Sequence, residues 1–271
     1  AEAGETTSSM AAKAARLAME AAGVAPEDIG LIVLATSTPD FNPFPSTACI
    51  VQSLLGCVNA GAFDLQAACA GFIYALEQAR GFVNFYPQRK ALVIGAECLT
   101  RILDWTDRSS CILFGDGAGA AVVECREGWP SIGAVLGSRG DDELLRVPGA
   151  ESGERSFIHM EGTKVFKFAV EAVPACIDAV LKKAGKTVED VDFFVFHQAN
   201  ARIIDLAVRK YRIPPEKYYK NIENYGNTAA ASVPLVLSEL EEQGRIGPGS
   251  RMLVVAFGGG LTWGGAMIEF A

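Results

Sequence analysis

The chain has 271 residues, half of them hydrophobic, and a formal net charge of −8. That length and apolar content suffice for a large core, either in one duplicated domain or in two tightly packed halves. No apolar run approaches the ~18 residues that cross a bilayer, and the negative charge would repel nucleic acid. We therefore expect no membrane insertion and no nucleic-acid partner.

The cysteines indicate a reducing compartment. The chain has seven cysteines, an odd number, and none of them forms a C-x-x-C pair. Most lie inside apolar segments, which is typical of buried free thiols rather than of a disulfide framework. The first residues also lack the basic and apolar regions of a signal peptide. We therefore expect a cytoplasmic protein.

The first part of the chain alternates helices with buried strands. Helical periodicity predicts a first helix over Met10–Ala22, with Thr7 or Ser8 as its N-cap and Gly23 as its stop. A second helix is expected over Cys69–Phe85. Continuous apolar runs, which are typical of strands covered on both faces, lie at Leu31–Ala35, Ala62–Leu65, Ala91–Gly95 and Ala121–Val123.

The second part continues the alternation. Pro174 lies inside one expected helix and should bend it or mark a local break. The expected helices are Lys164–Lys183, Ala199–Tyr211 and Ala230–Gln243. The expected strands are Ile132–Leu136, Phe193–Phe196, Leu253–Phe257 and Ala266–Phe270.

An internal repeat organises these elements. Ala22-Gly23-x-x-x-Glu-Asp-Ile-x-Leu-Ile-Val recurs as Ala184-Gly185-x-x-x-Glu-Asp-Val-x-Phe-Phe-Val. Phe114-Gly-Asp-Gly, which leads into a strand, matches Phe257-Gly-Gly-Gly, which should lead into one after a longer loop. We therefore expect two similar halves, residues 1–126 and 127–271, with the reactive residues where their strand ends meet. The first half has too few residues before its repeated helix for the matching strand, so we infer that an N-terminal strand is missing.

Cys69 is the first candidate for chemistry. It lies in Ala67-Ala68-Cys69-Ala70-Gly71, where an expected strand gives way to a helix. A helix N-terminus stabilises a thiolate, which is the nucleophilic form, and the small neighbours leave room for a substrate. The alternative is a small buried hydrophobic residue.

His197 and Asn227 occupy similar junctions. His197 ends an apolar run and begins His-Gln-Ala-Asn200, although it could equally be a core histidine bonded to the backbone. Asn227 precedes an alanine-rich helix, where an asparagine is more often a cap or turn residue. The other histidine, His159, we interpret as structural. A cysteine, a histidine and an asparagine at neighbouring strand ends suit acyl transfer: a nucleophile, a proton shuttle and an oxyanion donor.

At this point the chain resembles a known family. Ala68-Cys69-Ala-Gly-Phe, His197-Gln-Ala-Asn200, Gly226-Asn227-Thr-Ala-Ala-Ala-Ser and Phe257-Gly-Gly-Gly-Leu-Thr-Trp-Gly are similar to motifs of β-ketoacyl-acyl carrier protein synthase III. The resemblance covers essentially the whole chain. It implies a thiolase-like αβαβα fold of five layers, a homodimer and no cofactor. It also implies condensation of a short acyl-CoA, such as acetyl-CoA, with malonyl-acyl carrier protein to begin fatty-acid synthesis.

The resemblance also implies roles for single residues. Cys69 would take the acyl group, His197 and Asn227 would hold the malonyl thioester, Phe257 would shield the site, and the N–H groups of Cys69 and Gly259 would form the oxyanion hole. Arg108 would contact the CoA nucleotide, and Phe44 would reach the partner's acyl pocket in the dimer. Positions matching the pantetheine tunnel are Gly162, Thr163 and Asn200.

Charge and glycine patterns complete the expectations. Gly115-Asp-Gly-Ala-Gly119 and Gly258–Gly260 lack G-x-G-x-x-G spacing and should enter strands, so we interpret them as tight turns rather than phosphate loops. A basic cluster could be a solvated helix face or a dock for the acidic carrier protein. It comprises Arg202, Arg209, Lys210, Arg212, Lys217 and Lys220, with Lys167 placed nearby by the resemblance.

Three rival interpretations remain at this stage. A related thiolase-like acyltransferase of secondary metabolism would share the site but use another substrate pair. A papain-like cysteine hydrolase also uses Cys, His and Asn, but its Cys-Gly-Ser-Cys-Trp type of sequence is missing from this chain. The third rival is a catalytically inactive structural relative, which the intact trio disfavours.

Overall fold

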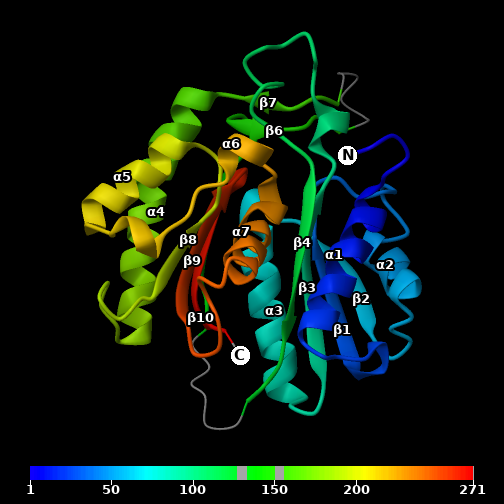
Figure 1. Cartoon of the computed structure of the whole chain (residues 1–271). Helices are drawn as coiled ribbons and strands as arrows, with labels where there is room; N and C mark the ends of the chain where they lie inside the picture. Colours follow the sequence, from blue (N-terminus) through cyan, green and yellow to red (C-terminus); the bar gives the residue numbers. More distant parts are fainter. Residues whose placement is uncertain (127–132, 150–155, 271) are drawn as a thin grey trace.

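The structure is a computed structural model that describes residues 1–126, 133–149 and 156–270. Both parts of the chain build a four-stranded sheet with helices on either side (Figure 1). The first part forms α1 (Thr7–Ala21), β1 (Ile29–Ala35), α2 (Thr47–Leu55), β2 (Gly61–Leu65), α3 (Gly71–Phe85), β3 (Lys90–Glu97) and β4 (Gly117–Val123). The second forms β5 (Val135–Asp141), β6 (Leu145–Arg146), β7 (His159–Met160), α4 (Gly162–Ala184), β8 (Phe193–Phe196), α5 (Ala201–Tyr211), α6 (Ile222–Tyr225), α7 (Ser232–Glu242), β9 (Arg251–Gly258) and β10 (Gly260–Glu269).

The two sheets have related topologies. The first has the order β2-β1-β3-β4, in which only the β3–β4 pair is antiparallel. The second has the order β5-β10-β9-β8, in which β8 and β9 are parallel and β10 is antiparallel to both of its neighbours. Three parallel strands in the first sheet and two in the second therefore lead to an antiparallel strand. This arrangement brings the carboxyl ends of β1, β3, β8 and β9 toward one region of the molecule.

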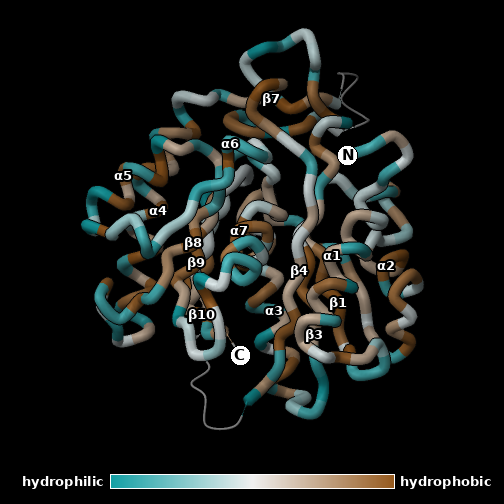
Figure 2. Tube along the Cα trace, in the orientation of Figure 1, coloured by the Kyte–Doolittle hydropathy of each residue, from teal (hydrophilic) through white to brown (hydrophobic). Residues whose placement is uncertain are grey.

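Packing of the side chains stacks the elements into five layers, as expected for the thiolase-like αβαβα fold. Helices α1 and α2 cover one face of the first sheet through Ile32 and Leu34 of β1, while Val33 and Ala35 pack inward on α3. In the second sheet, Val254 and Ala256 of β9 face the same central layer, and Leu253 and Val255 face α4 and α5. The central layer is α3 with α7. Figure 2 shows the resulting brown, apolar strands beneath more polar outer helices.

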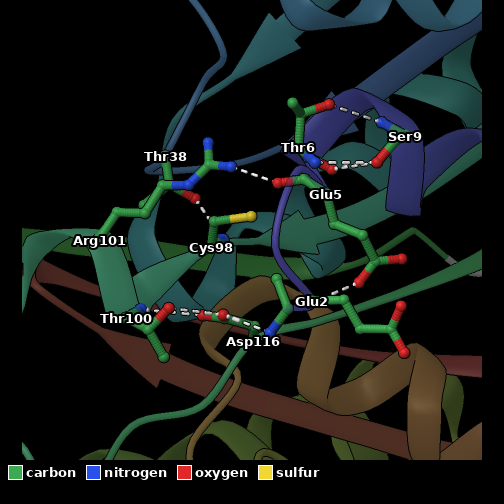
Figure 3. A network of polar contacts seen from close by, with 10 residues as sticks. Glu2, Glu5, Thr6, Ser9, Thr38, Cys98, Thr100, Arg101 and Asp116 are labelled. Atoms are coloured by element: carbon green, nitrogen blue, oxygen red, sulfur yellow. Dashed lines mark hydrogen bonds and ion pairs between the residues drawn. The ribbon is translucent and has the colours of Figure 1, made fainter.

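Helix α1 begins earlier than the periodicity predicted. Its N-cap is Thr6 rather than Thr7 or Ser8, because Thr6 and Ser9 bond each other's backbone in a capping box (Figure 3). The same figure shows polar contacts near the start of α1. Asp116 accepts hydrogen bonds from the backbone and hydroxyl of Thr100 at 2.9 and 2.6 Å, and the Arg101 side chain bonds the Glu5 carbonyl.

Other elements also differ from the sequence predictions. The expected longer loop after Phe257 is wrong: β10 starts at Gly260, directly after β9, so the glycines form a tight hairpin. Helix α4 runs through Pro174 without the local break considered above. The strand expected from Ile132 starts at Val135, and Ile132 itself lies outside the described residues.

Helix α2 was not predicted, because its nine residues are too short for a clear period. Its N-cap, Ser46, accepts a hydrogen bond from Cys49. Among the helices in residues 1–126, 133–149 and 156–270, none has the length and apolar character needed to cross a membrane.

Candidate active site

Two of the three candidate residues follow a strand, whereas Asn227 follows the short helix α6, so the expectation of a strand end before Asn227 is wrong. Cys69 lies in a 3₁₀ turn, Ala68–Ala70, between β2 and α3, and His197 directly follows β8. Asn227 precedes a second 3₁₀ turn, Ala229–Ala231, which leads into α7. Ala68 and Ala229 have positive φ angles of 45° and 43°. A left-handed alanine costs about 1–2 kcal/mol, so each junction stores backbone strain next to a candidate residue.

One cavity of about 360 Å³ brings these residues together. Its wall combines the end of β9, the short strands β6 and β7, the turn that carries Cys69 and the N-terminal ends of α4 and α5. The expected site residues that line it are Cys69, His197, Asn227, Phe257, Gly162, Thr163, Asn200 and Arg202. The sequence therefore identified residues that share one cavity although they are up to 188 positions apart.

The imidazole of His197 is buried and has no polar partner. Only 3% of the residue is exposed, and within the described chain neither Nδ1 nor Nε2 has a hydrogen-bond partner. Its backbone N–H donates to the carbonyl of Val255 at 2.9 Å, which fixes the residue to β9. Burial lowers its pKa from 6.5 to about 3, so the ring is neutral. Two unpaired ring nitrogens in a cavity are ready to bond a substrate.

The Phe257 ring covers one side of this imidazole. The two ring centres are 5.4 Å apart in an edge-to-face arrangement, and Phe168 packs behind Phe257 at 6.3 Å. An aromatic wall of this kind keeps water away from the imidazole and favours an uncharged product over a carboxylate.

Cys69 is also buried and is surrounded by apolar side chains. Only 7% of it is exposed, and it packs with Leu99, Leu103, Ile158 and Ala229. Burial, followed by the negative charge of Glu97, raises the pKa of the Cys69 thiol to about 12. Burial and the charge of Glu97 thus oppose the stabilisation that the helix N-terminus was expected to give a thiolate. The thiol needs a proton acceptor when it reacts, and the apolar lining has room for a short acyl chain.

Asn227 is held by its backbone and by its own side chain. Its N–H donates to the Leu113 carbonyl at 2.8 Å, and its carbonyl accepts from Gly115 at 3.0 Å. The side-chain Oδ1 accepts the N–H of Ala229 at 2.9 Å, across the left-handed turn. Because Oδ1 is occupied in this way, the side-chain NH₂ is the donor that Asn227 can offer to the cavity.

The glycine hairpin lies directly against the nucleophile turn. A Cβ at Gly258 would lie 2.6 Å from the backbone nitrogen of Cys69, so only glycine fits there. Gly258 lines the cavity, whereas Gly259, the expected oxyanion donor, is not among its lining residues. The hydroxyl of Thr262 joins the two segments, with 2.9 Å to the Ala67 carbonyl and 3.1 Å to that of Gly259.

Three further expected residues lie at or near the cavity mouth. Arg202 is in the first turn of α5, and its N–H donates to the side chain of the N-cap Asn200 at 2.9 Å. Arg108 is exposed on the loop 103–113, whose end contributes Leu113 to the cavity wall. Lys167 is exposed on α4, about one turn beyond the lining residues Gly162 and Thr163.

Other expected residues lie away from the cavity. Arg209 and Lys210 are exposed near the C-terminal end of α5, and Lys210 is 3.8 Å from Asp178. Phe44 is 79% exposed in the loop after β1 and does not line the cavity. Its expected role requires a second copy of the chain.

Sequence reasoning missed much of the apolar wall. Leu113 and Phe114 come from the approach to β4, and Leu145 and Met160 come from the short strands β6 and β7. Single apolar residues in loops and two-residue strands carry no periodic signal, so nothing in the sequence pointed to them. In the described residues no group of three or more His, Cys, Asp or Glu side chains could hold a metal ion.

Comparison with known proteins gives consistent matches. Two family models match, "3-Oxoacyl-[acyl-carrier-protein (ACP)] synthase III" over residues 63–140 and its C-terminal counterpart over residues 181–270. The β-ketoacyl-[acyl-carrier-protein] synthase III of Clostridium perfringens is 46% identical, over 98% of this chain and 85% of that protein.

Solved structures agree. The crystal structure of 3-oxoacyl-[acyl-carrier-protein] synthase III from Aquifex aeolicus superimposes with a TM-score of 0.92 at 43% identity, covering 98% of this chain and 85% of that one. The priming β-ketosynthase of the R1128 polyketide pathway superimposes with a TM-score of 0.94 at 38% identity, covering 100% and 83%.

Proposed function

The chain belongs to the β-ketoacyl-[acyl-carrier-protein] synthase III family, and from that premise we propose that it is an acyltransferase that starts fatty-acid synthesis. It condenses a short acyl-CoA, acetyl-CoA above all, with malonyl-acyl carrier protein. The products are 3-oxoacyl-acyl carrier protein, CoA and carbon dioxide. The observation that carries the proposal is the cavity that joins Cys69, His197 and Asn227.

The first step of the proposed reaction loads the acyl group. The Cys69 sulfur attacks the thioester carbonyl of acetyl-CoA, the new S–C bond forms, and CoA leaves as a thiol. Because the pKa of Cys69 is about 12, its proton must be taken during the attack, and the neutral His197 is the base in the cavity. The N–H groups of Cys69 and Gly259 are the proposed donors to the developing oxyanion.

The second step makes the carbon–carbon bond. The malonyl thioester carbonyl oxygen accepts hydrogen bonds from the one N–H of the neutral His197 ring and from the Asn227 NH₂, which together stabilise the enolate left when carbon dioxide departs. The enolate carbon attacks the acetyl carbonyl on Cys69, the C–S bond breaks, and the released thiolate takes up a proton from solvent. Phe257 supports this step because an apolar wall disfavours the starting carboxylate. The chemistry needs only these side chains, so we propose that the enzyme uses no cofactor.

A two-stage mass measurement tests the proposal. Incubation with acetyl-CoA should add one acetyl group, and peptide mapping should place it on Cys69. Subsequent addition of malonyl-acyl carrier protein should remove that group and release 3-oxobutyryl-acyl carrier protein. Acetylation at Cys98 or Cys111, or a stable acetyl-enzyme that malonyl-acyl carrier protein does not discharge, would contradict the proposal. Malonyl-CoA in place of the carrier-bound substrate distinguishes a secondary-metabolism enzyme.

We further propose how the substrates approach. Arg108 contacts the CoA nucleotide, and Gly162, Thr163 and Asn200 line the path of the pantetheine arm; the last three line the cavity. The acidic carrier protein docks on the basic face formed by Lys167, Arg202, Arg209 and Lys210, all of which are exposed. Opposite charge there would steer the encounter.

A homodimer is the third part of the proposal. β2 is the edge strand of its sheet and pairs only with β1 in the described residues, so its outer backbone is free for a second copy. Phe63 on this strand is 40% exposed, and the exposed Phe44 would reach the partner's acyl pocket. Phe63→Asp should convert a dimer into monomers in light scattering, whereas Phe85→Asp, an equally apolar exposed site on α3, should not. A dimer that survives Phe63→Asp would argue against pairing through β2.

Two broader expectations stay proposals. We propose that the chain divides into halves at residues 126 and 127, a division supported by sheets built from 29–123 and 135–269. We also propose that the enzyme acts in the cytoplasm, where its seven free cysteines would stay reduced.

A further inference from the structure

Glu97 is a fully buried carboxyl group outside the catalytic trio. It is the last residue of β3 and has 0% exposure. Its oxygens accept hydrogen bonds from the hydroxyl of Thr38 at 2.6 Å, the hydroxyl of Thr36 at 3.2 Å and the N–H of Ser37 at 3.0 Å. Thr38 is itself fixed, because it accepts the N–H of Cys98 at 2.9 Å (Figure 3). The backbone of Ala230, from the other half of the molecule, also stabilises the charged carboxylate.

The internal repeat shows what this position corresponds to. Strand β3 and strand β9 both have eight residues, and each position in one lies 161 residues from its counterpart in the other. By this register Glu97 corresponds to Gly258. The same spacing relates the turn Ala68–Ala70 to the turn Ala229–Ala231, so Cys69 corresponds to Ala230.

The two strand ends therefore meet the two turns in equivalent ways. At the catalytic turn the strand end is Gly258, which has no side chain and lies against the Cys69 nitrogen. The Cys69 N–H is thus left open for a substrate oxyanion. At the second turn the strand end is Glu97, whose carboxylate is stabilised by the backbone of the equivalent residue, Ala230. An anion of the protein itself occupies the position that corresponds to the oxyanion hole.

We propose that Glu97 is a positioning residue, whose carboxylate fills this second oxyanion hole and thereby holds the strained turn that orients Asn227. The link to Asn227 is direct, because Asn227 Oδ1 accepts the N–H of Ala229, the residue before Ala230. Releasing Ala230 would loosen the left-handed Ala229 and, with it, the side chain that binds the malonyl thioester. The inference rests on the proposed function for the role of Asn227.

The charge of Glu97 also acts on the Cys69 thiol. The titratable groups near the Cys69 thiol are Glu97 from β3 and His197 at the end of β8. Burial raises the pKa of Glu97 from 4.5 to about 7, despite its hydrogen bonds. Its charge in turn contributes to the raised pKa of Cys69. Loss of the charge should therefore make the thiol easier to ionise, while loss of the hydrogen bonds should impair the Asn227 step.

These opposite effects provide the test. Glu97→Gln keeps the size of the side chain but brings an NH₂ group into a pocket that contains only donors. We expect malonyl-acyl carrier protein decarboxylation to fall by at least about tenfold. In the same variant, alkylation of Cys69 by iodoacetamide should become faster at pH 7.5, with its pH profile displaced to lower pH. Glu97→Asp, which keeps the charge, should alkylate like the wild type and recover part of the decarboxylation.

The control is Glu77→Gln. Glu77 is a partly buried carboxylate on α3 that pairs with Arg80, and it lines neither the cavity nor the turns. It should change neither readout. Parallel losses of both activities in Glu97→Gln would indicate general damage and overturn the proposal, as would no change in either. If the wild type showed no decarboxylation, the proposed function would be refuted. Alkylation needs no substrate, so the alkylation rates would still test the inference on Glu97.

Discussion

The 3₁₀ turns Ala68–Ala70 and Ala229–Ala231 have closely similar backbones and different surroundings. Each starts with an alanine near φ 45° and leads directly into a helix of the central layer, α3 or α7. The first turn carries a thiol and borders a cavity, whereas the second carries only methyl groups and is bonded by Glu97.

The difference shows how the same left-handed turn can serve two purposes. Strain of about 1–2 kcal/mol persists in the second turn although no nucleophile is there. In the first turn the left-handed residue presents Cys69, and in the second it presents an N–H to the Asn227 side chain that precedes it. In the proposed reaction, one half of the duplicated chain supplies the nucleophile and the other supplies the groups that bind the second substrate.

The largest effect should come from removing the nucleophile. Cys69→Ser should reduce condensation by more than about 10³-fold, because a hydroxyl in this buried turn stays protonated and attacks poorly. Malonyl decarboxylation should persist, because His197 and Asn227 are untouched. Both are measured with radiolabelled malonyl-acyl carrier protein. Cys111→Ser, on the partly exposed loop, should behave as the wild type. Retained condensation in Cys69→Ser would show that another residue takes the acyl group.

The second largest effect should come from removing the Asn227 side chain in the second half. Asn227→Ala should lower decarboxylation about 10²–10³-fold, the usual cost of one oxyanion donor, and should spare acetylation of Cys69. Its counterpart by the repeat is the exposed Gln66, so Gln66→Ala should leave both steps unchanged. Rates of acetyl-enzyme formation and of carbon dioxide release are to be measured separately. If Asn227→Ala slowed both steps equally, Asn227 would serve acyl loading as well.

The fold and the trio could be predicted because each produces a local signal. Apolar runs marked the buried strands, and local motifs singled out Cys69, His197 and Asn227, of which Cys69 and His197 follow strands. The positions were also chemically distinctive, since the chain has only two histidines. Local sequence and global fold agree here, and the cavity confirms that the three residues meet.

The rest depends on packing between distant segments. Leu145 and Met160 reach the cavity from two-residue strands, which no period predicts. Glu97 reads as the polar end of an apolar strand, and only the three-dimensional pairing with Ala230 shows what its carboxylate does. The raised pKa of Cys69 was missed for the same reason, because burial and a neighbouring charge are tertiary properties.

A smaller effect concerns stability in acid. The folded protein keeps His197 neutral down to about pH 3, whereas an unfolded chain binds the proton below about pH 6.5. The unfolded state therefore binds more protons between these values, and stability falls as the pH drops through the window. When the pH is lowered from 7.5 to 5, the free energy of unfolding should fall in both proteins. The fall should be smaller in His197→Gln than in the wild type, by on the order of 2 kcal/mol.

Urea denaturation at the two pH values measures this difference. The opposite contribution of Glu97, whose folded pKa is raised, is common to both proteins and cancels. His159→Gln, in which an exposed imidazole is replaced, should retain the wild-type pH dependence. Equal acid sensitivity of His197→Gln and the wild type would mean that the imidazole takes up a proton in the folded state.

The smallest expected effect concerns Arg202, at the cavity mouth in the second half of the chain. Arg202→Glu should lower kcat/KM for malonyl-acyl carrier protein several-fold at low salt, because reversing a rim charge that faces an acidic partner mainly slows association. Added salt should shrink the difference, since screening acts on both proteins. Acetyl transfer from CoA should change little. Lys182→Glu, an identical charge change at the far end of α4, is the control. A defect that persists at high ionic strength, or an equal loss with acetyl-CoA, would show that Arg202 shapes the active site instead of docking the carrier.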